Sequence, residues 1–399
     1  MTDQDAPGLN SWSPQSVIDW LFAEGCKLDD NLRFVRELGH RLNESGAGIG
    51  QIRVVLQTLH PQIVGVVTIW SRHDDSARLV LAERQVRVSE RYIGSPLQQL
   101  IETEASVRQV LTDLPEDAHG AYRDLAADGM TDYLAMPIMT AKGYSAAFIL
   151  ASDREGGYSD ADIDALHRIR DYLVPILEVH SLRHLSRSLL NTYVGRRTGE
   201  KVLAGMIERG DSDLIHAALW FSDLRDFTRL TETLAPADVL GMLNDYFEFI
   251  AAAVGAHGGE ILRFIGDAML IVFPIDAQRD ARAACNAALE AALDAETTLA
   301  SLNHRRRRQQ QPEIQFGVGL NVGEVIYGNV GAPDRLDFTV MGPAVNRAAR
   351  LESLTKDLGK RILMSGDFAG YLDVPLRAFD NQHMKGVEGA QTVYALQSD

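Results

Sequence analysis

The sequence predicts a mixed α+β protein with two strand-and-helix regions joined by a helical segment. Three observations support this fold class. Residues 51–150 alternate strand-like apolar runs with helical stretches, residues 182–207 place apolar side chains at helical spacing, and residues 215–396 alternate strands and helices again. Hairpins at 260–273 and within 378–396 make the second region typical of a ferredoxin-like α/β sandwich.

Length and charge limit the classes of function. A chain of 399 residues is long enough for two or three domains with substantial cores. Its formal net charge of −16 argues against nucleic acid as a partner, because a phosphate backbone requires clustered positive charge. A single nucleotide remains compatible with this charge, since it needs only a local cationic pocket.

Cysteine content and hydropathy predict a cytoplasmic protein. Cys26 and Cys285 lie far apart without metal-binding spacing, which favours a reducing compartment. We find no apolar run near the roughly 20 residues of a membrane span, and we expect no such span. The acidic start at residues 1–5 is unlike a secretory signal.

The chain begins with a short helical part. Residues 1–15 are polar and contain proline, so we expect a loose tail there. Apolar residues then recur at helical spacing over 16–23 and 31–43, and glycines at 46–48 end the pattern. Residues 1–45 are therefore assigned to an N-terminal helical segment.

Residues 46–180 have the element order of a small α+β sensor. We expect strands at 53–59, 63–70 and 79–81, a helix at 96–109, strands at 133–138 and 145–150 joined by a turn at Lys142 and Gly143, and a long helix from Ser159. The late strand pair and the helix start at 158–162 resemble a GAF domain. That resemblance implies a regulatory domain that either binds a small-molecule effector or serves only to dimerise.

Residues 181–210 predict a helical linker with a break. Apolar residues continue at helical spacing from 182 to 207, and the glycine-containing segment 195–199 interrupts them. Such a segment between a sensor and a catalytic unit could transmit a signal, and the same pattern fits a passive linker.

Residues 211–399 form the second α+β region. We expect strands at 215–222, 260–265, 268–273, 314–321 and 336–340, and helices at 235–254, 277–302 and 343–355. The arginine-rich stretch 304–311 is expected to be a solvated loop, and the glycines in 323–331 are expected to form tight turns.

Two aspartates follow strand-like runs in this region. Asp223 comes directly after the apolar run 217–221, and Asp267 lies in the turn of the 260–273 hairpin. Carboxylates at the ends of adjacent strands can share a divalent cation, and oxygen ligands suit Mg²⁺ or Mn²⁺ held together with substrate phosphates. Either aspartate alone could equally cap a helix or suit a turn.

Further polar residues fit chemistry on a phosphate. Asn346 and Arg350 lie four residues apart and hence on one face of the 343–355 helix. Lys385 lies beside a turn, and Arg263 precedes Asp267 by four residues. Each could be an ordinary surface or buried polar residue. Together with the aspartates they favour phosphoryl transfer, in which metals and fixed cations neutralise developing charge.

Residues 213–396 resemble the catalytic domain of the class III nucleotidyl cyclases, the adenylate and guanylate cyclase family. The motifs that carry the resemblance are FSDLRDFT at 221–228, FIGD at 264–267, VNRAAR at 345–350 and MKG at 384–386. Residues 186–209 also resemble the linker that precedes many bacterial cyclase domains.

The resemblance implies a metal and phosphate site on one side of the substrate. Asp223 and Asp267 would ligate two Mg²⁺ or Mn²⁺ ions, which activate the ribose 3′-hydroxyl and hold the triphosphate. Backbone amides at Phe227 and Thr228 would cradle the phosphates, as helix N-termini do. Asp226, where the family commonly has glycine, would add negative charge near the metals or cap the helix.

The resemblance also implies that a second subunit completes the site. Asn346 would orient the ribose, Arg350 would stabilise the α-phosphate, and Lys385, assisted by Arg335, would hold the terminal phosphates. In this family these residues face the aspartates of the partner subunit, so we expect a homodimer with two equivalent shared sites.

Base selection is less defined than the metal site. The family's adenine-selective residue is usually lysine and its guanine-selective residue glutamate, and here the position holds Arg263; the second base-reading position holds Thr339. A cationic donor without a carboxylate favours ATP over GTP, although a forked guanidinium could also read a pyrimidine carbonyl. We therefore expect an adenylate cyclase that forms cyclic AMP.

Two alternatives stay open from the sequence. One is a class III cyclase with another base preference, which would form cyclic GMP or a cyclic pyrimidine nucleotide. The other is a catalytically silent nucleotide-binding signalling module. A diguanylate cyclase is rejected, because Ile261 and Leu262 break the signature begun by residues 258–260.

Overall fold

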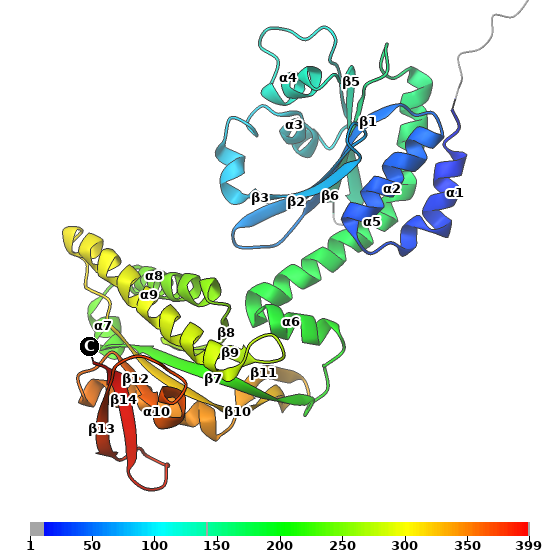
Figure 1. The fold of residues 1–399 in the computed structure, drawn as a ribbon. Coiled ribbons are helices and arrows are strands. Elements are labelled where there is room, and N and C mark those ends of the chain that lie inside the picture. Colours follow the sequence, from blue (N-terminus) through cyan, green and yellow to red (C-terminus); the bar gives the residue numbers. More distant parts are fainter. Residues whose placement is uncertain (1–11, 141–142, 398–399) are drawn as a thin grey trace, which may run out of the picture. The chain divides into compact units, whose positions relative to one another are not determined.

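The computed structural model describes residues 12–140 and 143–397, and the chain forms two compact units, Met1–Leu189 and Leu190–Asp399 (Figure 1). Each unit has its own sheet and its own hydrophobic core. The expected tail at residues 1–11 and the turn residue Lys142 lie outside the described residues.

The first unit is built on a six-stranded antiparallel sheet in the order β3-β2-β1-β6-β5-β4. Its strands are β1 Ile49–Gln57, β2 Ile63–Ser71, β3 Ser76–Glu83, β4 Val107–Val110, β5 Asp132–Thr140 and β6 Gly143–Ser152. Its helices are α1 Gln15–Ala23, η1 Gly25–Lys27, α2 Asn31–Glu44, η2 Arg84–Val88, α3 Pro96–Thr103, α4 Gly120–Ala127 and α5 Asp160–Val194.

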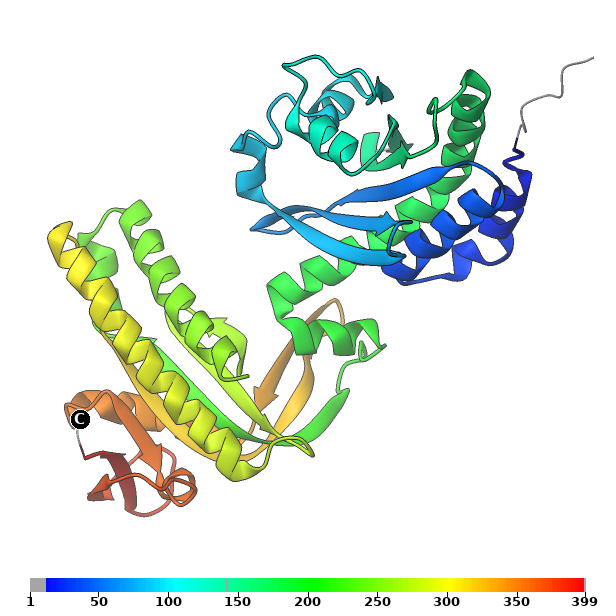
Figure 2. The same ribbon diagram turned by 45° about the horizontal axis from the view of Figure 1, so that its top comes forward.

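Alternation along the strands separates two apolar faces of this sheet. Helices α1, α2 and α5 lie on one face of the sheet, and α3 and α4 lie on the other (Figures 1 and 2). Ile52 and Val54 belong to the core shared with α1, α2 and α5, whereas Val55 and Ile149 belong to the core shared with α3 and α4. The start of α5 is a reciprocal cap, because the Ser159 amide donates to Asp162 Oδ2 at 2.7 Å and the Asp162 amide donates to Ser159 Oγ at 3.3 Å.

The helix expected at 96–109 is shorter than predicted. Ser95 caps its start, as its Oγ accepts a hydrogen bond from the Gln98 amide. Glu104 adopts a left-handed φ of 52°, which ends the helix, and β4 follows as an edge strand that the helical pattern concealed. The short helix α4 was also not anticipated.

The second unit contains α6 Arg196–Leu203, β7 Ser212–Leu224, α7 Phe227–Thr233, α8 Pro236–Ala256, β8 Glu260–Ile265, β9 Ala268–Ile275, α9 Ala281–Arg308, β10 Phe316–Ala332, β11 Arg335–Met341, α10 Pro343–Asp357, β12 Ile362–Ser365, α11 Gly366–Ala369, β13 Leu376–Gln382 and β14 Gln391–Leu396. Within its eight-stranded sheet, the order β10-β7-β9-β8 is antiparallel throughout. The β7-α8-β8-β9-α9-β10 succession confirms the ferredoxin-like prediction.

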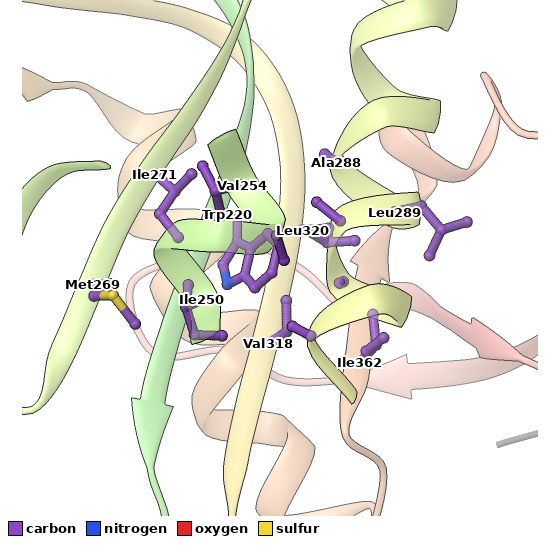
Figure 3. Close-up of a cluster of buried hydrophobic side chains, with 14 of the residues drawn as sticks. Trp220, Ile250, Val254, Met269, Ile271, Ala288, Leu289, Val318, Leu320 and Ile362 are labelled. Carbon is purple, nitrogen blue, oxygen red and sulfur yellow. The ribbon is translucent and has the colours of Figure 1, made fainter. Parts of the chain in front are cut away.

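Helices cover both faces of this sheet. Trp220 lies fully buried beneath α8 and α9, where it packs among apolar side chains that include Ile250, Ala288 and Val318 (Figure 3). On the opposite face Ala348 of α10 shares a smaller apolar cluster with strand residues of β7, β9 and β10. Helix α10 is therefore held on the side of the sheet away from α8 and α9.

One described helix, α8, is long and apolar enough to meet a simple criterion for a membrane span. This differs from the expectation that no apolar run reaches that length. Within the unit, Met242, Tyr246 and Ile250 of α8 are buried in the core, and the Tyr246 hydroxyl donates to Ser222 Oγ at 3.0 Å. Packing on the sheet therefore accounts for these residues of α8, whereas Leu240 of the same helix is 60% exposed.

Two local predictions in this unit were wrong. The arginine-rich stretch continues α9 to Arg308, and Arg306 is 4% exposed because it donates to Asp245 Oδ2 at 2.6 Å and to the Pro312 carbonyl at 2.8 Å. The glycines of 323–331 do not form successive tight turns, since β10 runs through them and pairs with both β7 and β11. The predicted helix break near 195 is confirmed, with Gly195 at φ 86° between α5 and α6.

The packing of α10 on β10 depends on a glycine. A Cβ at Gly319 would lie 2.1 Å from the Ala348 carbonyl oxygen and 2.4 Å from the Glu352 amide nitrogen, both backbone atoms of α10. We expect Gly319→Ala to lower the free energy of unfolding by about 1–3 kcal/mol in urea titrations, because α10 must move away.

The control is Gly241 of α8, which has no such neighbour within 4 Å. Gly241→Ala should raise the same free energy by about 0.4–1 kcal/mol, and equal stabilities of the two variants would contradict this account.

Candidate active site

Asp223 is held at the end of the central strand of the second unit. It is the penultimate residue of β7, and β7 pairs with β9 on one side and with β10 on the other. Since Trp220 points into the α8–α9 core, strand alternation places Asp223 on the face that α10 covers. The opposite residue on β10 is Gly317.

Asp267 reaches the same place from the β8–β9 hairpin. Ile265 pairs with Ala268, so Gly266 and Asp267 form a two-residue turn, and Gly266 supplies the left-handed φ of 66°. Ser222 pairs with Met269, which brings the end of β7 beside this turn. Asp223 and Asp267 consequently line one open pocket of about 440 Å³.

The electrostatics of the pair suit a cation. Burial, the adjacent Asp267 carboxylate and the charge of Glu352 raise the pKa of Asp223 to about 7. Asp223 Oδ1 is buried and has no hydrogen-bond partner among the described residues. Two close carboxylates with an unsatisfied oxygen fit hard divalent ions such as Mg²⁺ or Mn²⁺.

No cluster of three or more His, Cys, Asp or Glu side chains that could hold a metal occurs among the described residues. A cation at Asp223 and Asp267 would therefore complete its coordination with oxygen atoms other than those of a third carboxylate. Phosphate oxygens of a substrate are suitable, because Mg²⁺ is commonly bound by one or two carboxylates together with phosphates.

The turn after β7 forms the second wall of the pocket. Phe227 and Thr228 line it, together with Asp226, whose φ of 56° is left-handed. The Asp226 side chain makes no capping hydrogen bond to α7; its carboxylate lies 3.8 Å from Lys356 Nζ and 3.9 Å from Arg229. The sequence left open whether Asp226 caps the helix, and the structure shows that its side chain does not.

A third carboxylate near the pair was missed from the sequence. Glu352 of α10 is 6% exposed, and burial and the charge of Asp267 raise its pKa. Gly317 leaves room for it, because a Cβ there would lie 2.6 Å from Glu352 Oε1 and 2.8 Å from an Arg225 nitrogen. Arg225 in turn donates to Thr355 Oγ1. The helical period of α10 places Glu352 inward, but only the folded sheet brings it below Asp223.

The remaining predicted catalytic residues lie outside this pocket in a single chain. Asn346 and Arg350 are exposed on α10, Lys385 is exposed in the loop between β13 and β14, and Arg335 is exposed at the start of β11. None of them lines the pocket of Asp223 and Asp267. The structure thus groups the predicted metal and phosphate ligands and leaves the other predicted residues free on the surface.

Arg263 has a partner that the sequence did not reveal. Its guanidinium lies 2.5 Å from Asp337 Oδ2, and the two side chains are 45% and 49% exposed. Asp337 and Thr339 are two residues apart on β11 and so point to the same side, with Thr339 buried. The candidate base-reading residues therefore include an aspartate as well as Arg263 and Thr339.

Comparison with known proteins shows where similarity lies. The family model of the adenylate and guanylate cyclase catalytic domain matches residues 213–398. Adenylate cyclase 1 of Rhizobium meliloti (strain 1021) is 35% identical over 180 residues, which cover 44% of this chain and 26% of that protein. An adenylate cyclase of Anabaena cylindrica is 33% identical over 201 residues, which cover 48% of this chain and 39% of that protein.

Similarity to solved structures is also partial. A bacterial light-regulated adenylyl cyclase is 30% identical over 46% of this chain and 91% of its own, with a TM-score of 0.41. This chain spans less than half the length of the two curated relatives named above. The family match falls in the second unit and includes every candidate site residue described above.

Proposed function

We propose that the chain converts ATP to 3′,5′-cyclic AMP and pyrophosphate, because residues 213–398 match the family model of the adenylate and guanylate cyclase catalytic domain. The observation that carries the proposal is the pair Asp223 and Asp267, which has a buried unsatisfied oxygen and lines one pocket with Phe227 and Thr228. Divalent ions held by the pair would neutralise the triphosphate and lower the pKa of the ribose 3′-hydroxyl.

The roles of the remaining residues follow from the charge that develops in the reaction. As the 3′-oxygen attacks and pyrophosphate leaves, negative charge grows on the α-phosphate, and Arg350 would stabilise it. Asn346 would orient the ribose for in-line attack, and Lys385 with Arg335 would hold the terminal phosphates. Backbone amides at the start of α7 would bind phosphate oxygens from the side of the aspartates.

We propose that two copies of the chain share each site. Asn346, Arg350 and Lys385 are exposed and lie outside the aspartate pocket, which supports their donation to a partner's pocket. A two-fold symmetric dimer would then contain two equivalent sites.

ATP is the proposed substrate, and GTP is the second candidate. Two relatives named as adenylate cyclases support ATP. The sequence argument against GTP was that Arg263 lacks a carboxylate for guanine N1–H and N2–H₂. Asp337 beside Arg263 provides such a carboxylate, and this contact is the specific observation that favours GTP.

Product analysis with each nucleoside triphosphate and Mn²⁺ tests both candidates. We expect cyclic AMP as the main product, and cyclic GMP or a cyclic pyrimidine nucleotide as the main product would contradict the ATP assignment. Asp337→Asn replaces one of the two acceptor oxygens with an NH₂ donor, so guanine N1–H and N2–H₂ can no longer both be accepted, and the ratio of kcat/KM for GTP to that for ATP should fall about tenfold. An unchanged ratio would exclude Asp337 from base selection. Asp380→Asn, on β13, is a matched control that should leave the ratio unaltered.

We further propose that the first unit regulates catalysis through α6. Thr198 of α6 is buried and its hydroxyl lies 2.7 Å from the Tyr327 hydroxyl of β10. The Tyr327 ring packs edge-on against Phe338, which is the residue between Asp337 and Thr339 on β11. The Arg197 amide also donates at 2.8 Å to Glu260 of β8, the strand that carries Arg263. A shift of α6 would therefore act on both base-reading strands.

Comparing residues 190–399 with the full chain tests this regulatory role. We expect specific activity to differ by more than about fivefold, as is common for coupled domains, with both proteins assayed at equal dimer fraction. Equal activity at equal dimer fraction would leave the first unit without a regulatory role. A change in dimer fraction alone would show that it acts by dimerisation.

A further inference from the structure

The first unit contains a pocket of about 650 Å³, which is lined by residues between Arg53 and Ile149 and by none of the candidate cyclase residues. Its floor is the sheet face that carries Val55, Val67 and Ile149, and its walls include Leu97 and Leu125. The volume is in the range of pockets that enclose small organic ligands. A mostly apolar lining of this kind binds an apolar body.

An arginine stands on this apolar floor. Arg53 of β1 lies opposite Ile69 of β2 and Ile149 of β6, and its neighbour on the same face is Val55. Its Nε donates to Gln51 Oε1 at 2.6 Å. Within residues 12–140 and 143–397, no Asp or Glu oxygen lies within 4.0 Å of the Arg53 guanidinium.

The absence of a carboxylate partner distinguishes Arg53 from two other arginines of this unit, Arg108 and Arg154. Arg108 is bound to Asp132 at 2.9 Å, and Arg154 is bound to Asp162. Asp124 and Asp128 act on Arg53 only from a distance, and burial lowers the pKa of Arg53. Arg53 is half-buried, and its Gln51 partner is neutral, so its positive charge is not balanced by a carboxylate. Burying an unbalanced charge is costly, and an anion bound at this place would offset that cost.

The charge of the surrounding wall supports an anion. The charged lining residues are Arg53, Arg91 and Glu83, which leaves a net positive charge in a chain whose net charge is −16. Arg78 of β3 pairs with Ile69, so Arg78, Ile69 and Arg53 form one row across three strands of the same face.

We propose that this pocket binds an organic acid, with its anionic group on the Arg53 guanidinium and its apolar body on the floor around Val55 and Ile149. The guanidinium can donate two parallel hydrogen bonds to a carboxylate or a similar anion. The binding proposal does not depend on the proposed cyclase activity, and the test below therefore measures binding alone.

The test uses the full chain and isothermal titration with two acids and their neutral amides. The probes are 1-naphthoate with 1-naphthamide, and decanoate with decanamide. At least one acid should bind about tenfold or more tightly than its own amide, because only the acid forms charge-assisted hydrogen bonds. A tighter naphthoate identifies an aromatic ligand body and a tighter decanoate an aliphatic one, and both results support the site.

Two arginine variants test whether acid binding requires Arg53 itself or only the positive charge of the protein surface. Arg53→Gln should weaken the bound acid about tenfold and leave its amide unchanged, whereas Arg33→Gln, at an exposed position of α2, should alter neither. Val80 lines the pocket and is 41% exposed, so Val80→Trp should fill the rim without entering the core and should weaken acid and amide alike. Equal affinity for acid and amide, full acid affinity in Arg53→Gln and in Val80→Trp, or no binding of either acid would overturn the proposal.

Discussion

Asp223→Asn and Asp267→Asn should each lower cyclic nucleotide formation by about 10³-fold while leaving the unfolding temperature equal or higher. Each substitution removes a carboxylate that would hold the divalent ions, and those ions would stabilise the charge that develops on the phosphate. The two carboxylates lie together in one pocket, and their proximity and burial raise the pKa of Asp223 to about 7. A raised carboxylate pKa means that the ionised pair opposes folding at neutral pH. Replacing one charge with a neutral amide therefore relieves repulsion in the metal-free protein.

The combination of lost activity with retained stability distinguishes a functional site from a structural one. Activity is measured as cyclic nucleotide formed with Mn²⁺, and unfolding is followed by circular dichroism without metal. Asp238→Asn, in the exposed first turn of α8, is a matched control that should change neither quantity. Full activity in Asp267→Asn would show that the metal assignment is wrong, and a large loss of stability in both variants would indicate a structural pair.

A heterodimer of Asp267→Asn and Arg350→Ala chains should be active although each homodimer is inactive. If Asp267 and Arg350 meet across two subunits, one of the two sites in the heterodimer combines intact Asp267 with intact Arg350. The expected activity is roughly half that of the wild-type dimer, since one of two equivalent sites survives. Differently tagged chains allow the heterodimer to be purified before the assay.

The matched control is a heterodimer of Asp267→Asn with Asp223→Asn. Both substitutions affect the metal half of the site, so neither site of this dimer is intact and no activity should return. An inactive Asp267→Asn and Arg350→Ala heterodimer, isolated by both tags, would rule out the shared-site arrangement. Recovery in both heterodimers would show that Asp223 and Asp267 of one site do not come from the same subunit.

Local patterns in the sequence accounted for much of the second unit. The hairpin of β8 and β9 was predicted because two apolar runs flank Gly266 and Asp267, and the turn lies at these residues. The same reasoning misjudged residues 304–311, since the charge of an isolated arginine run favours solvent. Arg306 is instead buried in α9, because it donates a hydrogen bond of 2.6 Å to Asp245, about 60 positions earlier in the chain.

Contacts between distant segments explain the site residues that were missed. Glu352 lies below Asp223 because Gly317 and Gly319 let α10 approach the sheet closely. Asp337 meets Arg263 because β11 folds back along β10. Neither contact can be predicted from periodicity in the sequence, because each joins segments that come together only in the folded sheet.

The sequence by itself determined the α+β class, the ferredoxin-like succession of elements and the candidate roles of Asp223, Asp267, Asn346, Arg350 and Lys385. These predictions depend on periodicity and on short motifs, and both are local features of a few consecutive residues. Tertiary structure alone decided that the aspartates line one pocket and that the other three side chains remain outside it. It also decided that Arg53 lies on an apolar floor with the neutral Gln51 as its hydrogen-bond partner. Those outcomes depend on strand order and helix packing, which place residues far apart in the chain next to each other.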